Sequence, residues 1–235
     1  MKVLVFAATS PTGIELMRAL LEAEHNVVAY VRDPTKVPDE LRTSITVIEG
    51  QITDKNTICR AMDGVDAVVS LLGPSVPTIS AMYHYPHDTP IGKAYPLIIS
   101  CMRELGVRRL IALSTASWKD QQNDKFSLLH SLMVWSVWLF ARGCYNEMNV
   151  IADTVSGIGK DLDLEWTIVR VPALTNAKTK FVVAGYPGDG QSTVTLSRAA
   201  FAAWVTRELE EGQWKWRAPH LSDPTNNFHA FSSSS

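Results

Sequence analysis

Residues 3–13 read VLVFAATSPTG, an apolar run that ends in a turn of small residues. Apolar side chains then recur at helical spacing over residues 14–21, so the turn joins a strand to a helix. In an open parallel sheet, a helix that begins at such a turn presents unpaired N–H groups and a partial positive charge. The stretch therefore predicts a strand–turn–helix unit whose turn is a candidate phosphate site.

The same alternation continues along the chain. Apolar strands are expected at residues 27–31, 45–48, 67–72, 109–114 and 166–169. Helices are expected at residues 54–62, 95–105, 143–155 and 197–209, several of them with capping residues at their ends. Such alternation predicts an α/β fold, a doubly wound parallel sheet of the Rossmann type, because crossovers between parallel strands are right-handed.

The chain is expected to form a single domain over residues 1–235, a length that suffices for one large core. Residues 1–120 would form the dinucleotide-binding core. Residues 121–224, where the pattern loosens, would form a small C-terminal substrate-side lobe. Residues 225–235 are polar, end in a serine run and are expected to be a loose tail.

The composition excludes several classes of protein. The net charge of −2 gives no polyanion-binding surface, so no nucleic-acid partner is expected. The N-terminal apolar run is too short for a signal peptide, which favours a cytoplasmic location. Cys59, Cys101 and Cys144 are odd in number and far apart, which argues against a disulfide framework or a zinc site and suits a reducing compartment.

The longest uncharged run covers residues 126–141. It is shorter than the roughly 20 apolar residues that a membrane span needs. A buried or partner-facing helix is expected instead, one that lines the substrate pocket or a subunit contact and does not span a bilayer. Trp135 and Trp138 within it would line an apolar pocket, fill core or form a dimer contact. The protein is accordingly expected to be a monomer or a homodimer.

A long polar and aromatic loop follows the strand at 67–72 and contains His84, His87 and Asp88. A metal site would need further ligands in a defined geometry, and no second cluster is evident, so no metal is expected. The loop lies where open α/β sheets hold their ligands. It is expected either to face the substrate or to pack on itself.

Three positions in the first turn usually hold glycine in dinucleotide-binding sheets, and here they are Ala7, Ser10 and Gly13. Only the glycine that allows close packing of helix on strand is kept. The hydroxyls of Ser10 and Thr12 would donate to phosphate and partly replace the lost backbone access. The alternative is a small connecting loop in a fold that no longer binds a ligand.

The end of the second strand indicates which dinucleotide would bind. An acidic residue at this place holds the ribose hydroxyls of NAD, whereas a nearby arginine accommodates the 2′-phosphate of NADP. Here the residue is Arg32, with Lys36 four positions on. The pair favours NADP(H) as the cofactor, the alternative being two solvated surface cations.

With these residues the chain resembles the NmrA-like, atypical short-chain dehydrogenase family, which includes members of the biliverdin reductase B and flavin reductase types. The resemblance covers nearly the whole chain and rests on several stretches together, which are residues 5–13, 31–36, 64–73, 106–115, 164–172, 196–200 and 208–212.

The resemblance implies an NADP(H) site. The pyrophosphate would lie on Thr9, Ser10, Pro11, Thr12 and Gly13, and the 2′-phosphate on Arg32. Leu72 and Gly73 would flank the ribose, Ser114 and Thr115 the nicotinamide, and Pro172 would stand in the loop beside it.

Many relatives also carry an active-site Tyr-x-x-x-Lys, and this chain offers Tyr145 with Asn149 at the lysine position. Ser114 and Tyr145 are the expected catalytic hydroxyls, each able to hydrogen-bond a substrate oxygen as charge develops on it. The expected function is reduction of a small, largely apolar carbonyl or conjugated substrate. A non-enzymatic NADP(H) sensor, or a redox-neutral isomerase or cyclase on the same fold, remain as alternatives.

Overall fold

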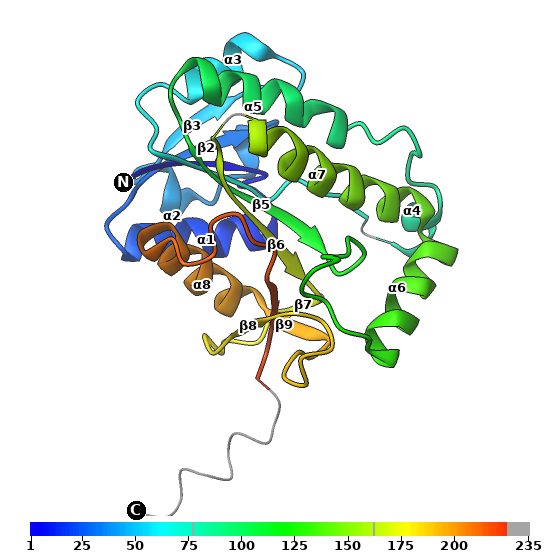
Figure 1. Cartoon of the computed structure of the whole chain (residues 1–235). Helices are drawn as coiled ribbons and strands as arrows, with labels where there is room; N and C mark the ends of the chain where they lie inside the picture. The colour runs from blue at the N-terminus through cyan, green and yellow to red at the C-terminus, as the bar shows by residue number, and fades with distance from the viewer. Residues whose placement is uncertain (77, 162, 225–235) are drawn as a thin grey trace, which may run out of the picture.

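The computed structural model describes residues 1–76, 78–161 and 163–224, and the expected tail at residues 225–235 lies outside them (Figure 1). The chain builds one eight-stranded sheet in the order β3-β2-β1-β4-β5-β6-β10-β8. Its strands are β1 (Lys2–Phe6), β2 (Asn26–Val31), β3 (Thr46–Glu49), β4 (Ala67–Ser70), β5 (Arg109–Thr115), β6 (Glu165–Val171), β8 (Val183–Gly185) and β10 (His220–Ser222). Every neighbouring pair is parallel except the edge pair β10–β8. A separate parallel pair joins β7 (Ala173–Thr175) to β9 (Thr195–Ser197).

Helices cover both faces of the sheet, as Figure 1 shows. The helices are α1 (Pro11–Glu22), α2 (Asp39–Arg42), α3 (Lys55–Ala61), α4 (Ile79–Tyr83), α5 (Tyr95–Glu104), α6 (Leu128–Phe140), α7 (Arg142–Asp161) and α8 (Arg198–Glu211), with 3₁₀ turns η1 (Pro34–Lys36) and η2 (Gly92–Ala94). Residues of α1 and α8 pack with one set of strand side chains, and those of α3, α5 and α7 with the other. In β1 the two sets alternate, since Val3 and Val5 face α1 while Leu4 and Phe6 face the opposite core. The predicted doubly wound Rossmann sheet is confirmed.

Local sequence signals place several helix ends correctly. Ser10, Asp54 and Ser197 each accept a backbone N–H of the helix that they begin. Gly212 ends α8 with a φ of +61°, a left-handed conformation that favours glycine. The helix expected at residues 143–155 is longer than predicted, because it continues to Asp161.

The expectation that no disulfide forms is wrong. Cys59 of α3 and Cys101 of α5 are paired, and only Cys144 is a free, buried thiol. The two partners are 42 residues apart in the chain, so their spacing carries no signal. They meet because α3 and α5 lie side by side on one face of the sheet.

Of the alternatives for residues 126–141, the buried helix is wrong, and so is the idea that Trp135 and Trp138 fill core. The partner-facing helix stays a prediction. Of the residues in α6, only His130 is buried, and both tryptophans are exposed. The reason is the placement of α6 at a corner of the molecule (Figure 1), where its main neighbour is α7. Among the described residues, no helix is both long and apolar enough to cross a membrane.

Candidate functional site

The turn between β1 and α1 keeps the geometry of a glycine-rich turn although two glycines are replaced. Ala7 has a φ of +56°, in the left-handed region that side chains other than glycine rarely adopt. The N–H of Ser10 donates to the carbonyl oxygen of Ala7 at 3.0 Å and closes the turn. The residue at the first glycine position is therefore held in a conformation that suits glycine.

Gly13 is required by close packing of α1 on β1. A Cβ atom at this position would lie 2.5 Å from the carbonyl oxygen of Ala7 and 2.6 Å from that of Ala8. No side chain fits in that space without moving backbone. The spacing-based prediction that this glycine serves helix-to-strand packing is confirmed by the geometry.

The first turn of α1 has donors available to an anion. Ser10 is the N-cap, and its Oγ accepts from the N–H of Gly13 at 3.0 Å, which leaves its hydroxyl hydrogen able to donate outward. Pro11, at the first helical position, has no N–H. Thr12 is buried. The start of the helix still offers its partial positive charge to an anion.

Arg32 directly follows β2, the strand next to β1. Its side chain is exposed and makes no hydrogen bond or ion pair with any residue that the structure describes. Lys36 is also exposed, but its Nζ lies 3.6 Å from a carboxylate oxygen of Asp33. The two predicted cations therefore differ, because only Lys36 already has an acidic neighbour.

Asp33 is the acidic residue that directly follows Arg32, and its carboxylate is already hydrogen-bonded within the protein. It accepts the N–H of Thr35 at 3.0 Å and the hydroxyl of Thr35 at 2.5 Å, which caps η1. These hydrogen bonds from Thr35 lower the pKa of Asp33 below its usual value. The carboxylate of Asp33 is thus engaged in the η1 turn.

Met148 of α7 lies beside the ends of the paired strands β4 and β5. A Cβ atom on Gly73, in the segment after β4, would lie 3.4 Å from the Sδ atom of Met148. Ser114, near the end of β5, is fully buried and its hydroxyl donates to the carbonyl oxygen of Met148 at 3.1 Å. Thr115, the last residue of β5, shares a hydrogen bond of 2.6 Å with the hydroxyl of Ser117.

Tyr145 lies in the first turn of α7, one helical turn before Met148. Its ring is half-buried, and its hydroxyl makes no hydrogen bond within the described part of the chain. Asn149, which stands where relatives have lysine, donates from its Nδ2 to the carbonyl oxygen of Tyr145 at 2.7 Å. The amide is therefore held against the helix backbone.

Glu147 is a buried carboxylate that the sequence patterns did not single out. One oxygen accepts the N–H of Gly92 at 2.6 Å, and the other accepts the hydroxyl of Tyr85 at 2.8 Å. Burial, and next this hydrogen bond, raise the pKa of Tyr85 above its usual value. Tyr85 and Pro86 also pack closely on Gly143, so this part of the loop, expected either to face the substrate or to pack on itself, is attached to the start of α7.

A second buried polar cluster lies beside the end of β6. Arg170 is fully buried and forms a two-pronged ion pair with Asp124, with N–O distances of 2.6 and 2.8 Å. Beside it the rings of His130 and His220 meet edge to face, 5.1 Å apart. Burial lowers the pKa of His220 to about 3. No signal in the sequence paired these residues, which come from a loop, α6, β6 and β10.

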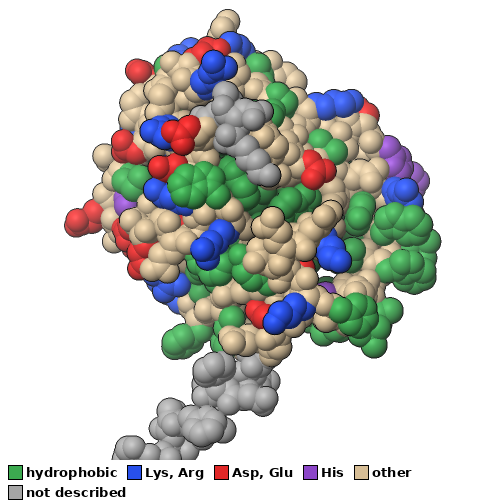
Figure 2. All heavy atoms as spheres, viewed as in Figure 1, with side chains coloured by type: hydrophobic (Ala, Val, Ile, Leu, Met, Phe, Trp, Pro, Cys, Tyr) green, Lys and Arg blue, Asp and Glu red, His purple; other side chains and the backbone are tan. Residues whose placement is uncertain are grey.

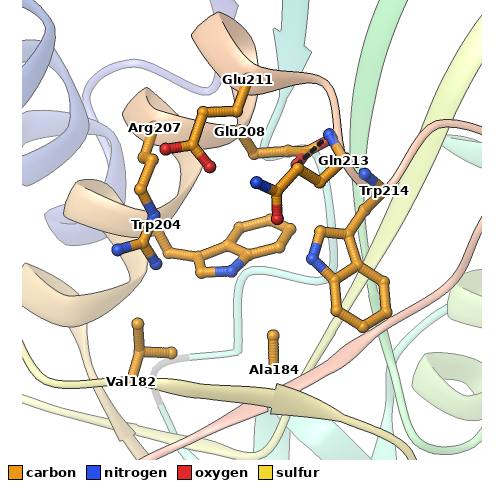
Figure 3. Close-up of a pocket in the computed structure, with 8 residues that line it drawn as sticks. All are labelled: Val182, Ala184, Trp204, Arg207, Glu208, Glu211, Gln213 and Trp214. Carbon is orange, nitrogen blue, oxygen red and sulfur yellow. Dashed lines mark hydrogen bonds between the residues drawn. The ribbon is translucent and has the colours of Figure 1, made fainter.

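A cavity of about 360 Å³ lies elsewhere, between α8 and the β8 edge (Figure 3). Figure 3 shows Glu211 of α8 above the ring of Trp204, with the guanidinium of Arg207 beside that ring. The lining residues are Val182, Ala184, Trp204, Arg207, Glu208, Glu211, Gln213 and Trp214. Glu208 also binds Arg109, the first residue of β5, at 2.8 Å, so the cavity lies toward the amino ends of the strands. None of the predicted site residues lines it.

The predicted cofactor residues instead lie at or just after the ends of five strands that are neighbours in the order β2-β1-β4-β5-β6. The carboxyl ends of parallel strands meet at one edge, and the order reverses between β1 and β4, the place where such sheets bind ligands. The residues on this edge are Thr9, Ser10, Pro11, Thr12, Gly13, Arg32, Lys36, Leu72, Gly73, Ser114, Thr115 and Pro172. The fold therefore brings these residues to one edge of the sheet, while the role of each stays a prediction.

The sequence matches a family described as NAD(P)H-binding over residues 7–212. The chain belongs to this NAD(P)H-binding family. The match begins at Ala7, in the turn after β1, and ends at Gly212, so it includes every predicted cofactor-binding and catalytic residue. The expected family is confirmed at this level, and a nicotinamide dinucleotide is the cofactor that it implies.

Solved structures support the fold. A short-chain dehydrogenase/reductase from Veillonella parvula is 17% identical, with a TM-score of 0.73 over 95% of this chain and 94% of that one. The oxidoreductase ylbE from Lactococcus lactis is 14% identical, with a TM-score of 0.71 over 96% and 92%. ChuY, an anaerobillin reductase from Escherichia coli, is 16% identical, with a TM-score of 0.70 over 95% and 98%. At these identities the similarity establishes the Rossmann fold alone.

Proposed function

We propose that this protein is an NADP(H)-dependent reductase of a small, largely apolar carbonyl or conjugated compound. The observation that carries the proposal is the carboxyl edge of the sheet, where the capped start of α1, Arg32 after β2 and the hydroxyls at the end of β5 lie along neighbouring strands. The family supplies the nicotinamide cofactor, and the fold is shared with an anaerobillin reductase.

The choice of NADP(H) over NAD(H) rests on Arg32 and Asp33. NAD-specific sheets use an acidic residue at the end of the second strand to hold the ribose hydroxyls. Here that place is taken by an exposed arginine, and the carboxylate of Asp33 is occupied by Thr35. A guanidinium with no protein partner among the described residues suits a 2′-phosphate, to which it could donate two hydrogen bonds.

When bound, NADPH would supply a hydride, and the residues of the chain would orient the substrate and provide a proton. Tyr145 is the better proton donor of the two expected catalytic residues, because its hydroxyl is uncommitted within the described residues. Ser114 already donates its one hydrogen to Met148, so toward a substrate it would serve as an acceptor unless that bond opens.

The test is a titration of the purified protein with NADPH and NADH, followed by intrinsic tryptophan fluorescence. NADPH is expected to bind at least tenfold more tightly, and Arg32→Ala to remove the difference. Lys36→Ala is the matched control, with a smaller effect because Lys36 already has Asp33 beside it. Equal affinities for the two cofactors, or an unchanged preference in Arg32→Ala, would contradict the assignment.

A second candidate is an NADP(H)-binding sensor without turnover. Two observations favour it, namely the amide of Asn149 held on the backbone in place of a catalytic lysine and the committed hydroxyl of Ser114. Such a protein would bind NADPH as the first test predicts. It would not oxidise NADPH in the presence of any compound from a panel of biliverdin-type, quinone and enone substrates.

A further inference from the structure

The outer surface of α6 is a large exposed apolar patch. Nine large apolar side chains between residues 126 and 140 are 36–83% exposed, and we call them the α6 patch. They are Phe126, Leu128, Leu129, Leu132, Trp135, Val137, Trp138, Leu139 and Phe140. Figure 2 shows apolar side chains gathered on the side of the molecule where Figure 1 places α6. Monomeric proteins rarely expose contiguous apolar patches beyond roughly 300–600 Å², and larger ones mark interaction sites.

The exposed side chains surround most of the helix and do not form a single stripe. Leu128 and Leu129 are consecutive, and so are the four residues from 137 to 140. Consecutive residues of an α-helix point about 100° apart. A partner helix would cover residues spaced three and four apart, such as Leu132 and Trp135, and would leave much of the patch in water. A fluid environment such as lipid, which adapts its shape to the helix, would cover more of these exposed side chains than a partner helix would.

The unpaired charges next to the two ends of α6 are positive and would complement an anionic surface. The helix contains no Asp, Glu, Lys or Arg. Lys125 precedes it and Arg142 follows it, both exposed and neither paired with a carboxylate in the described part of the chain. The guanidinium of Arg142 lies over the ring of Trp138, 4.4 Å from its centroid. Tryptophan beside a cation is typical of the boundary between lipid tails and headgroups.

The inner side of α6 keeps the helix on the protein. His130 is buried and packs on His220, and Ser127 caps the first turn. At the other end, Phe140 contacts Tyr83 of α4, whose exposed ring continues the patch. With 13 residues the helix is about 20 Å long at 1.5 Å per residue, short of the hydrocarbon thickness of about 30 Å. It would therefore lie in the plane of a membrane surface.

We propose that the α6 patch docks this protein on the surface of an anionic lipid bilayer. The apolar side chains would enter the boundary between headgroups and acyl chains, and Lys125 and Arg142 would face the phosphates. The interaction is peripheral, since α6 stays attached to α7 through the rest of the fold. This inference does not depend on the proposed reductase activity.

The experiment measures co-sedimentation of the full chain with sucrose-loaded vesicles. Vesicles of phosphatidylcholine with 30% phosphatidylglycerol are compared with vesicles of phosphatidylcholine alone. The wild type is expected to partition onto the anionic vesicles, and at least tenfold less onto neutral ones. The triple variant Leu132→Gln/Trp135→Gln/Leu139→Gln removes three side chains that are about half exposed, so it should fold normally, and its partitioning should drop at least tenfold.

The matched control is Phe181→Gln, which removes a 77% exposed aromatic ring elsewhere on the surface and should leave partitioning unchanged. Circular dichroism and light scattering report the fold and the oligomeric state of each variant. Three results would overturn the proposal. They are no partitioning of the wild type, equal partitioning of the triple variant, and a wild-type dimer that ignores vesicles and dissociates in the triple variant.

Discussion

The carbonyl oxygen of Ala7 lies 2.5 Å from where a Cβ atom of residue 13 would stand. This closeness brings α1 against the end of β1 and aims the start of the helix at the carboxyl edge of the sheet. Gly13→Ala should therefore force backbone apart and lower the free energy of unfolding by about 1–3 kcal/mol. Urea unfolding measures this change.

A matched control for that substitution is Gly157→Ala in α7, because a Cβ atom there meets nothing within 4 Å. In an exposed helical position, alanine is expected to stabilise by roughly 0.5–1 kcal/mol over glycine. If both variants unfold at the same urea concentration, the close approach at Gly13 does not limit stability.

Ala7→Gly should be tolerated or stabilising, in contrast to most core substitutions. The φ of +56° at Ala7 costs about 1–2 kcal/mol for an L-residue and nothing for glycine, part of which is offset by the greater freedom of glycine in the unfolded chain. Thermal unfolding tests this, with Ala8→Gly as the control that should destabilise. NADPH affinity should also rise, because the backbone comes closer to the phosphates. A loss of stability in Ala7→Gly comparable to that in Ala8→Gly would contradict the expectation.

If the proposed reductase activity is found, Tyr145→Phe should lower kcat more than it raises KM, by about 100-fold or more. Ser114→Ala should also lower kcat, and additionally loosen α7, since it removes the hydrogen bond to Met148. Steady-state kinetics with thermal unfolding of the same variants separate the two effects. Parent rates in both variants would mean that the proton comes from water or from another residue.

Stability should fall in mild acid because of His220. Burial lowers the pKa of His220 to about 3 in the folded protein, whereas the unfolded chain has a value of about 6.5. Between these values the unfolded chain binds a proton that the folded protein does not, so the free energy of unfolding decreases as pH falls from 6.5 toward 3. One such group contributes about 1.4 kcal/mol per pH unit. His220→Gln should reduce the slope of unfolding free energy against pH, and an unchanged slope would contradict this cause.

Reduction should destabilise the protein through the pair of Cys59 and Cys101. Their bond closes a long loop and joins α3 to α5, and such a cross-link is typically worth about 2–4 kcal/mol. The melting temperature should therefore drop on addition of dithiothreitol. Cys144→Ser should show the same drop, and a Cys59→Ala/Cys101→Ala variant none. If dithiothreitol does not change the melting temperature of the wild type, the bond between Cys59 and Cys101 does not contribute to stability.

Much of the fold followed from short-range patterns. The apolar run of the first strand, the small-residue turn and the cap residues Asp54 and Ser197 predict their elements closely, because a cap or a helical turn depends on residues no more than four apart. The candidate cofactor edge followed in the same way, since the carboxyl ends of parallel strands meet once the alternation is known.

Contacts between distant segments were decided by the tertiary structure. Arg109 binds Glu208, which lies 99 residues further along the chain, and Glu147 binds Tyr85. Both contacts depend on how a helix packs on the rest of the fold, which residue spacing in the sequence does not indicate. The apolarity of residues 128–140 was plain in the sequence, but their exposure was not. Apolarity belongs to a side chain, whereas burial depends on whether another part of the fold reaches it, and the described chain leaves most of α6 uncovered.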